Sequence, residues 1–252
     1  MTELLRIENL AKRFGGIVAT DDLVLNIPEG ELHAVIGPNG AGKTTLIAQL
    51  SGQLTPDSGR IYFGGQDITA VPMHARSGLG LARSFQITSL FLNLSVLDNV
   101  ALAVQAHAGH SFRFWRNARQ ESELRDPARA ALAWVGLSAR EDLPASALSH
   151  GEHRQLELAM ALASRPRMLL LDEPMAGLGP EESARMVSTM RDLKKELTIL
   201  LVEHDMEAVF ALADRITVLV YGRVIASGKP ADIRNNAQVR EAYLGEQEAV
   251  HG

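Results

Sequence analysis

A glycine-rich segment that contains one lysine, GPNGAGKT at residues 37–44, has the residue types and spacing most suggestive of chemistry. It matches the pattern G-x-x-x-x-G-K-[ST] at Gly37, Gly42, Lys43 and Thr44. Glycines let the backbone wrap closely, so that successive N–H groups point at phosphate oxygens, and the lysine reaches the β- and γ-phosphates of a nucleotide. A glycine-rich turn before a helix is the alternative interpretation.

The elements on either side of this segment favour phosphate binding. The apolar run from Leu32 to Ile36 predicts a strand that enters the segment, and TTLIAQLSG predicts a helix that leaves it and ends at Gly52. The positive end of that helix faces the phosphates, and the hydroxyl of Thr44 can bind Mg²⁺. We therefore expect one stretch of chain to bind ATP, namely Gly37, Pro38, Asn39, Gly40, Ala41, Gly42, Lys43, Thr44 and Thr45.

Two adjacent acids, Asp172 and Glu173, follow the apolar run MLLL. The run predicts a buried strand, and open α/β sheets bind ligands at the carboxyl ends of their strands. Alternatively, acids after a strand form only the first turn of a helix. Together with the glycine-rich segment, they predict that Asp172 holds Mg²⁺, directly or through water, and that Glu173 polarises the water that attacks the γ-phosphate.

The remaining pattern predicts an α/β fold built around a phosphate loop. The runs LLRIENL and LVLNI and a hairpin at 59–67 indicate an antiparallel β layer. Strand-like runs at 168–171 and 199–202, separated by a helix near 180–196, indicate a mostly parallel sheet, and RITVLVYGRVIASG indicates a last hairpin. We expect one domain over 1–252, with a nucleotide-binding core at about 1–90 and 166–230, an alanine-rich helical subdomain at about 91–165 and a helical tail at 231–252.

Bulk composition narrows the possible functions. The 252 residues are 46% hydrophobic and 22% charged, which is typical of a globular protein. The net charge of −5 gives no general attraction to nucleic acid, and the absence of cysteine excludes a disulfide scaffold, a thiol nucleophile and a Cys-ligated metal. We expect no secretory signal and no membrane-spanning helix, because no apolar run approaches about 18 residues.

With these motifs in place, the chain resembles the ATP-binding subunit of an ABC transporter over essentially its whole length, and the resemblance implies the ABC ATPase form of the P-loop NTPase fold. The further motifs stand in the family's order: Gln86 resembles the Q-loop glutamine, LSHGE (148–152) the signature, MLLLDEP (168–174) the second acidic motif, AGLGP (176–180) the D-loop, and His204 in LLVEHD the switch histidine. The resemblance implies that Gln86 joins the Mg²⁺ and water site and that His204 holds the γ-phosphate and orients the water.

An aromatic residue, Phe14, stands upstream of the phosphate loop, where the family stacks a ring on adenine. An aromatic residue near the end of a strand is more often part of the core, and a histidine after a buried strand, such as His204, is more often structural. Both alternatives remain open at this point.

The signature implies a second ATPase. By resemblance, Ser149 and the N–H of Gly151, at a helix start, grip the γ-phosphate of a nucleotide bound to a partner chain, so that two chains sandwich two ATP molecules. The usual LSGGQ is changed here at His150 and Glu152, but the two residues nearest phosphate are kept, so we expect this site to be intact. Gly179 stands where the D-loop usually has an acid or amide that hydrogen-bonds across the dimer.

Finer features resemble the ATPases of branched-chain amino acid importers. They are the opening KRFGGIVA, the stretch LSHGEHRQLELAMALA, an insertion between Val104 and Pro127, and the ending IRNNAQVREAYLGE with Tyr243 and Leu244. The resemblance implies two membrane permease subunits, a second ATPase that is the same or a different chain, a periplasmic solute-binding protein, and a position on the cytoplasmic face of the inner membrane. Relatives carry urea, short amides or aromatic acids, so the solute stays open. The lipopolysaccharide-export ATPase is similar too, but there we do not expect the insertion.

Two secondary features have competing interpretations. Residues 112–119 of the insertion combine aromatic and arginine side chains, which suit an amphipathic helix packed on its own domain, contact with a membrane subunit or lipid, or nucleic-acid stacking. The first is the interpretation we prefer. His107 with His110, and His150 with His153, have helical spacing, but without further ligands we predict no metal there.

Other ATPase classes agree less well with the sequence. ABC ATPases of DNA repair or chromosome structure carry long coiled coils between the nucleotide motifs, and translation-factor ABC proteins join two cassettes in one chain. A small-molecule kinase would share the phosphate loop but not LSHGE or His204. A non-hydrolysing scaffold would be expected to lose Lys43 or Glu173, and both are present.

Overall fold

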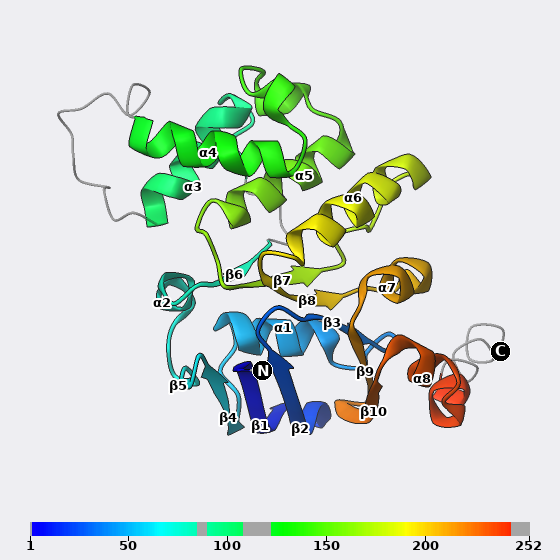
Figure 1. Cartoon of the computed structure of the whole chain (residues 1–252). Coiled ribbons are helices and arrows are strands. Elements are labelled where there is room, and N and C mark those ends of the chain that lie inside the picture. Colours follow the sequence, from blue (N-terminus) through cyan, green and yellow to red (C-terminus); the bar gives the residue numbers. More distant parts are fainter. Residues whose placement is uncertain (1, 85–89, 108–121, 243–252) are drawn as a thin grey trace.

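A six-stranded sheet occupies the centre of the computed structural model, which describes residues 2–84, 90–107 and 122–242 (Figure 1). Its order is β10-β9-β3-β8-β7-β6, and every pairing is parallel except that of β10 with β9. The predicted mostly parallel sheet and closing hairpin are thus confirmed. The strands are β3 (Leu32–Ile36), β6 (Leu81–Arg83), β7 (Met168–Asp172), β8 (Thr198–Val202), β9 (Arg215–Val220) and β10 (Arg223–Gly228).

A second, antiparallel sheet of four strands packs beside the first, as the sequence predicts. Its order is β2-β1-β4-β5, formed by β1 (Glu3–Phe14), β2 (Ile17–Pro28), β4 (Ser58–Phe63) and β5 (Gln66–Asp67). Helix α1 (Lys43–Ser51) lies between the two sheets (Figure 1). Its Leu46 and Leu50 share one core cluster with Leu5 of β1 and Leu170 of β7. Burial of this apolar surface fixes the helix that leaves the phosphate loop.

The opposite face of the central sheet is covered by helices. Because side chains alternate along a strand, Leu169 and Leu171 of β7 face away from Leu170. They pack in a different cluster, with α6 (Pro180–Leu193) and α7 (Met206–Leu212). The same cluster continues into α3 (Val96–His107), α4 (Ser122–Trp134) and α5 (His150–Leu162), which stand at the end of the molecule farthest from the antiparallel sheet (Figure 1).

Helix α8 (Pro230–Arg234) lies at the start of the predicted helical tail. Other short elements have no counterpart in the sequence prediction, namely β6, α2 (Met73–Gly78) and two single 3₁₀ turns at Ser138–Arg140 and Ala145–Ala147. Segments this short carry too little hydrophobic periodicity to be recognised and depend on long-range contacts. In the part of the chain that the structure describes, no helix has the length and apolar character needed to cross a membrane. Tyr243 and Leu244 lie outside the described residues.

Candidate active site

The phosphate loop, the acid pair and the switch histidine emerge from neighbouring strands at one edge of the central sheet. Val202 of β8 pairs with Val35 of β3 on one side and with Asp172 of β7 on the other. These strands run parallel, so their carboxyl ends lie side by side. The sheet register therefore brings together three motifs that are far apart in the sequence.

The phosphate loop is held in a close-packed conformation. A Cβ on Gly37 would collide with the backbone carbonyl of Leu219, and one on Gly42 would collide with that of Ala19. Gly42 also has a positive φ of 102° at the start of α1, which favours glycine. Nζ of the buried Lys43 donates to the carbonyls of Gly37 (2.6 Å) and Pro38 (2.9 Å), which ties the loop to its own helix.

The other loop residues differ in exposure. Ala41 is buried, and its carbonyl accepts a hydrogen bond from the N–H of Gly222 in the β9–β10 turn (2.9 Å). Asn39, Gly40 and Thr44 are exposed, whereas Thr45 is half-buried. The backbone thus forms a fixed cradle whose outer side is open to a ligand.

Asp172 is a buried carboxylate at the end of β7. Its Oδ2 accepts a hydrogen bond from Nη2 of Arg83 (3.1 Å), and Oδ1 has no hydrogen-bond partner among the described residues. Burial raises the pKa of Asp172, and the charge of Glu173 adds to this, whereas Arg83 and Lys43 act in the opposite direction. A buried, unpartnered carboxylate oxygen within electrostatic reach of the phosphate loop fits a hard cation, so the residues present suit Mg²⁺.

Glu173 and His204 approach each other at this edge. Nδ1 of His204 lies 3.9 Å from Oε1 of Glu173, and the imidazole is 64% exposed. His204 is therefore not a buried structural histidine. Glu173 has a left-handed backbone (φ 49°), which costs free energy for a non-glycine residue and directs the chain abruptly out of β7.

A second buried acid, Glu203, links the two strand ends. Its Oε1 accepts from the N–H of Met175 (2.9 Å), and its Oε2 accepts from the N–H groups of His204 (2.8 Å) and Asp205 (3.2 Å). The side chain is fully buried. Glu203 thus joins the residue directly before the D-loop to the segment that carries the switch histidine.

Sequence reasoning missed the roles of Arg83 and Glu203. Glu203 follows the apolar run TILLV, as Asp172 follows MLLL, and that parallel was a usable signal. Arg83 had no such signal, because β6 has only three residues and the paired acid lies 89 positions away.

The signature begins helix α5 with a reciprocal cap. The N–H of Ser149 donates to Oε2 of Glu152 (2.8 Å), and the N–H of Glu152 donates to Oγ of Ser149 (3.2 Å). Gly151 is buried against Glu182 of α6, whose carboxylate a Cβ at Gly151 would meet. The structure therefore packs the signature against the segment that follows the D-loop.

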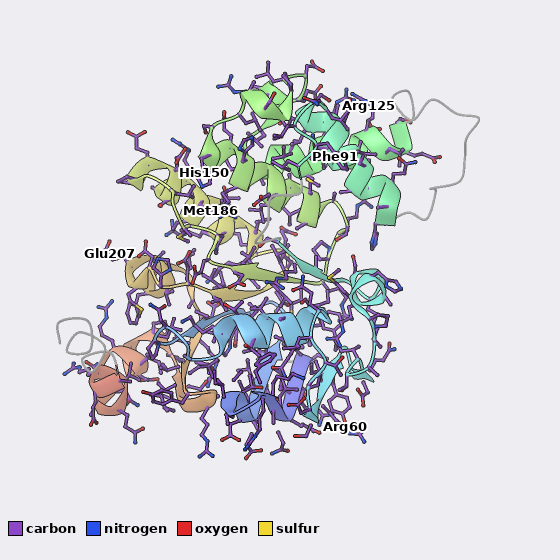
Figure 2. The ribbon with its side chains drawn as sticks, turned by 180° about the vertical axis from the view of Figure 1, so that it is seen from behind. Arg60, Phe91, Arg125, His150, Met186 and Glu207 are labelled. Atoms are coloured by element: carbon purple, nitrogen blue, oxygen red, sulfur yellow. The ribbon has the colours of Figure 1, made fainter. Side chains whose placement is uncertain are left out.

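His150 fills the space beside the D-loop. A Cβ on Gly177 would lie 3.3 Å from Nε2 of His150, and Gly177 has a φ of 78°. Gly179 has an ordinary extended backbone (φ −72°), and its N–H donates to Oε2 of Glu182 (3.2 Å). Figure 2 labels His150 at the start of α5 and Met186 on α6, and both labels lie across the helical region from those of Phe91 and Arg125.

The remaining predicted residues have mixed outcomes. Phe14 is 49% exposed at the end of β1, so its interpretation as a core residue is wrong. Gln86, His110 and the stretch 112–119 lie outside the described residues. His153 donates through Nε2 to the carbonyl of Ala145 (2.8 Å), and no group of three potential metal ligands of the His, Cys, Asp or Glu type occurs in the described part of the chain.

Comparisons with known proteins agree with this geometry. Residues 20–176 match the model of the family described as ABC transporter, and residues 223–249 match that of the branched-chain amino acid ATP-binding cassette transporter. The chain is 38% identical over 255 residues to LivG of Escherichia coli, a high-affinity branched-chain amino acid transport ATP-binding protein, with 96% of this chain and 98% of that protein covered. It is 37% identical over 250 residues to BraF of Pseudomonas aeruginosa, of the same description, with 96% and 98% covered.

Two further similarities bear on function and fold. The lipopolysaccharide export ATP-binding protein LptB of Acidithiobacillus ferridurans is 35% identical over 248 residues, with 98% of this chain and 99% of that protein covered. The crystal structure of an ABC-transporter ATP-binding cassette in its ADP conformation superposes with a TM-score of 0.86 at 31% identity, with 97% of this chain and all of that chain covered. The predicted P-loop ABC ATPase fold is confirmed, and the chain belongs to the ABC transporter family as one of its ATP-binding proteins.

Proposed function

We propose that this chain is the ATP-hydrolysing subunit of an ABC importer for branched-chain amino acids or related amino-acid or amide solutes. The observation that carries the proposal is the convergence of the phosphate loop, Asp172, Glu173 and His204 at one edge of the central sheet. Phosphoryl transfer to water needs positioning and charge neutralisation more than covalent chemistry, and this edge offers both.

Each residue of this edge has a proposed role. The loop Gly37–Thr45 binds the phosphates through its backbone, and Lys43 exchanges its bonds to loop carbonyls for bonds to the β- and γ-phosphates. Glu173 accepts the proton of the attacking water, and His204, 3.9 Å away, orients that water and the γ-phosphate. Phe14, exposed at the end of β1, stacks on adenine.

Mg²⁺ is the proposed metal, held by Thr44, Asp172 and Gln86. The exposed hydroxyl of Thr44 and the unpartnered Oδ1 of Asp172 are oxygen donors of the type that Mg²⁺ prefers. When bound there, the ion would supply positive charge that neutralises the phosphates. Arg83 donates a hydrogen bond to the other oxygen, Oδ2, and so leaves Oδ1 available to the ion.

Ser149 and Gly151 are proposed to bind the γ-phosphate of a nucleotide on a partner ATPase. The members of this family work as dimers with membrane permease subunits, and the partner here is either a second copy or a different chain. A periplasmic solute-binding protein would deliver the solute, and the ATPase would sit on the cytoplasmic face of the inner membrane. The D-loop, packed on the signature through His150, would lie at the same dimer surface.

The proposed solute rests on two similarities to branched-chain amino acid transport proteins, one at the C-terminal segment and one over nearly the whole chain. The family model for that group matches residues 223–249, and the relatives LivG and BraF cover nearly the whole chain. An ATPase of lipopolysaccharide export is the second candidate, because LptB is 35% identical. The C-terminal match favours the importer.

Reconstitution tests this function. The chain would be assembled in proteoliposomes with the permeases, second ATPase and solute-binding protein encoded by its neighbouring genes, and uptake of leucine, isoleucine and valine would be measured. We expect uptake that requires ATP and that Lys43→Ala abolishes. Neighbouring genes for lipopolysaccharide transport, or ATP hydrolysis stimulated by lipopolysaccharide and not by these amino acids, would overturn the importer.

A further inference from the structure

The signature of this chain has a carboxylate fixed at the start of α5. Oε2 of Glu152 accepts from the N–H of Ser149, and the N–H of Glu152 donates to Oγ of Ser149. This reciprocal cap leaves the carboxylate little freedom to turn away from the Ser149 hydroxyl. An anionic side chain therefore sits beside the hydroxyl proposed to receive a phosphate.

A second carboxylate lies against the same helix start. Glu182 packs on Gly151 closely enough that a Cβ there would collide with it, and Glu182 accepts from the N–H of Gly179 (3.2 Å). Two fixed negative charges beside a phosphate would repel it, and they oppose the favourable dipole of the helix start.

Arg140 lies against the first of these carboxylates. Its Nε is 3.2 Å from Oε1 of Glu152, whereas the other carboxylate oxygen, Oε2, accepts the hydrogen bond from the N–H of Ser149. Arg140 ends the 3₁₀ turn Ser138–Arg140 and lines, with the signature and α6, a cavity of about 480 Å³. The charged side chains in that lining are Glu152, Glu182, Arg140 and Arg185, so the lining is formally neutral only while Arg140 is present.

We propose that Arg140 is a positioning residue that neutralises Glu152 and so allows the signature to accept the γ-phosphate of a nucleotide bound to the partner ATPase. This inference rests on the proposed function. It also accounts for the departure of the signature from LSGGQ, because Arg140 supplies the positive charge that an acid in place of the glutamine requires.

The exposure of the pair indicates that its effect is on closure and not on folding. The side chains of Arg140 and Glu152 are 53% and 24% exposed, and ion pairs with this exposure contribute little to stability. When the partner covers the cavity, water is excluded and the same charges interact more strongly with phosphate. We therefore expect loss of Arg140 to affect the closed dimer and not the stability of the single chain.

The test compares four variants in the Glu173→Gln background: Arg140→Ala, Glu152→Gln, the two together, and Arg129→Ala. Arg129 is the matched control, because its pair with Glu141 has nearly the same exposure, 50% and 26%, and lies outside the cavity lining. Association driven by ATP would be measured by analytical ultracentrifugation, with the second ATPase present if the chain does not pair with itself. Glutamine keeps the reciprocal cap while removing the charge.

We expect Arg140→Ala to weaken ATP-driven association about tenfold or more, with the melting temperature unchanged. Glu152→Gln should restore it in the double variant, and Arg129→Ala should have no effect. In the chain with Glu173 intact, Arg140→Ala should raise the KM for ATP more than it lowers kcat.

The possible failures are distinguishable. If Arg140→Ala leaves association intact, or if Glu152→Gln does not restore it, the role of Arg140 is wrong and the proposed function stands. If the Glu173→Gln parent fails to associate on adding ATP with either partner, the sandwich itself is wrong, and with it this inference and the proposed role of Ser149.

Discussion

Two halves of the proposed active site are built in different ways. The strand-end half comprises the loop Gly37–Thr45 with Asp172, Glu173, Glu203 and His204, and the helix-start half comprises Ser149–Glu152 with Arg140 and the D-loop. The first grows out of strands that are buried throughout and is tied by buried groups such as Lys43 and Glu203. The second stands at an exposed helix start and is held by exposed or half-buried side chains.

This difference indicates which positions of such a site tolerate substitution. All three departures from the usual motifs, at His150, Glu152 and Gly179, fall in the helix-start half or the D-loop packed on it. Core packing constrains the residues of the strand-end half, whereas a neighbouring side chain can compensate for a substitution in the helix-start half. The comparison predicts large effects from isosteric changes in the first half and small or reversible ones in the second.

The largest effect is expected for Glu173→Gln. Loss of the proposed general base should lower the ATP turnover of the assembled transporter by about 10²–10⁴-fold while ATP binding is kept. Glu181→Gln, a change of the same type at an exposed position of α6, is the control. Steady-state phosphate release measures both variants, and unchanged turnover in Glu173→Gln would remove this residue from the base role.

Glu203→Gln tests whether the buried carboxylate of Glu203 maintains the geometry of the strand-end half. An amide group cannot accept from Met175 on one side and from His204 and Asp205 on the other, so at least one backbone N–H loses its acceptor. We expect the free energy of unfolding to fall by about 1–3 kcal/mol, measured in urea, together with reduced turnover. Glu207→Gln, on the exposed side of α7 (Figure 2), should change neither. Equal behaviour of the two variants would contradict the linking role.

Asp172→Asn gives a pH-dependent contrast. Because the pKa of Asp172 is raised above its ordinary value of 3.8, its ionised form costs folding free energy, and this cost grows as the pH rises through the folded pKa. The melting temperature of the variant relative to the parent should therefore increase from pH 4 to pH 7, without nucleotide or Mg²⁺. A difference that stays constant over this range would show that the buried charge is already compensated.

Gly179→Asn should have the smallest effect. A Cβ at Gly179 meets only Oε2 of Glu182, at 4.0 Å, and asparagine is at least as good an N-cap as glycine, so we expect a gain of a few tenths of a kcal/mol. The amide should also strengthen ATP-driven association. Gly177→Asn is the contrast, since a positive φ and the nearby His150 make that site strained. Thermal unfolding of both variants measures the difference, and destabilisation by Gly179→Asn would refute the tolerance of this half.

The strand-end half was largely predictable because its signals are local. A short apolar run beside glycine or an acid indicates a buried strand and its functional end, and β3 has the predicted bounds Leu32–Ile36. Helix α1 also ends directly before the predicted Gly52, which caps it with a left-handed backbone. The order of motifs then indicated the family, and with it the edge of the sheet at which they meet.

The contacts that support the site were not predictable in this way. The pairing of Arg83 with Asp172 depends on β6, a three-residue strand that is the outermost of the central sheet. The pairing of Arg140 with Glu152 depends on a single 3₁₀ turn. Neither element has a periodic pattern, and both are fixed by packing of distant segments. Sequence reasoning therefore found the residues proposed to touch ATP and missed those that hold them.

The three hydrogen bonds of Glu203 have a consequence for communication between two sites. Met175 directly precedes the D-loop, which is proposed to lie at the dimer surface, and His204 is proposed to face the nucleotide of its own chain. Because one buried side chain holds the backbone of both residues, a shift of the His204 backbone would either move the segment that leads into the D-loop or break a buried hydrogen bond. If the His204 backbone moves on product release, that release would be coupled to the contact offered to the partner ATPase, and the two sites would then hydrolyse ATP alternately.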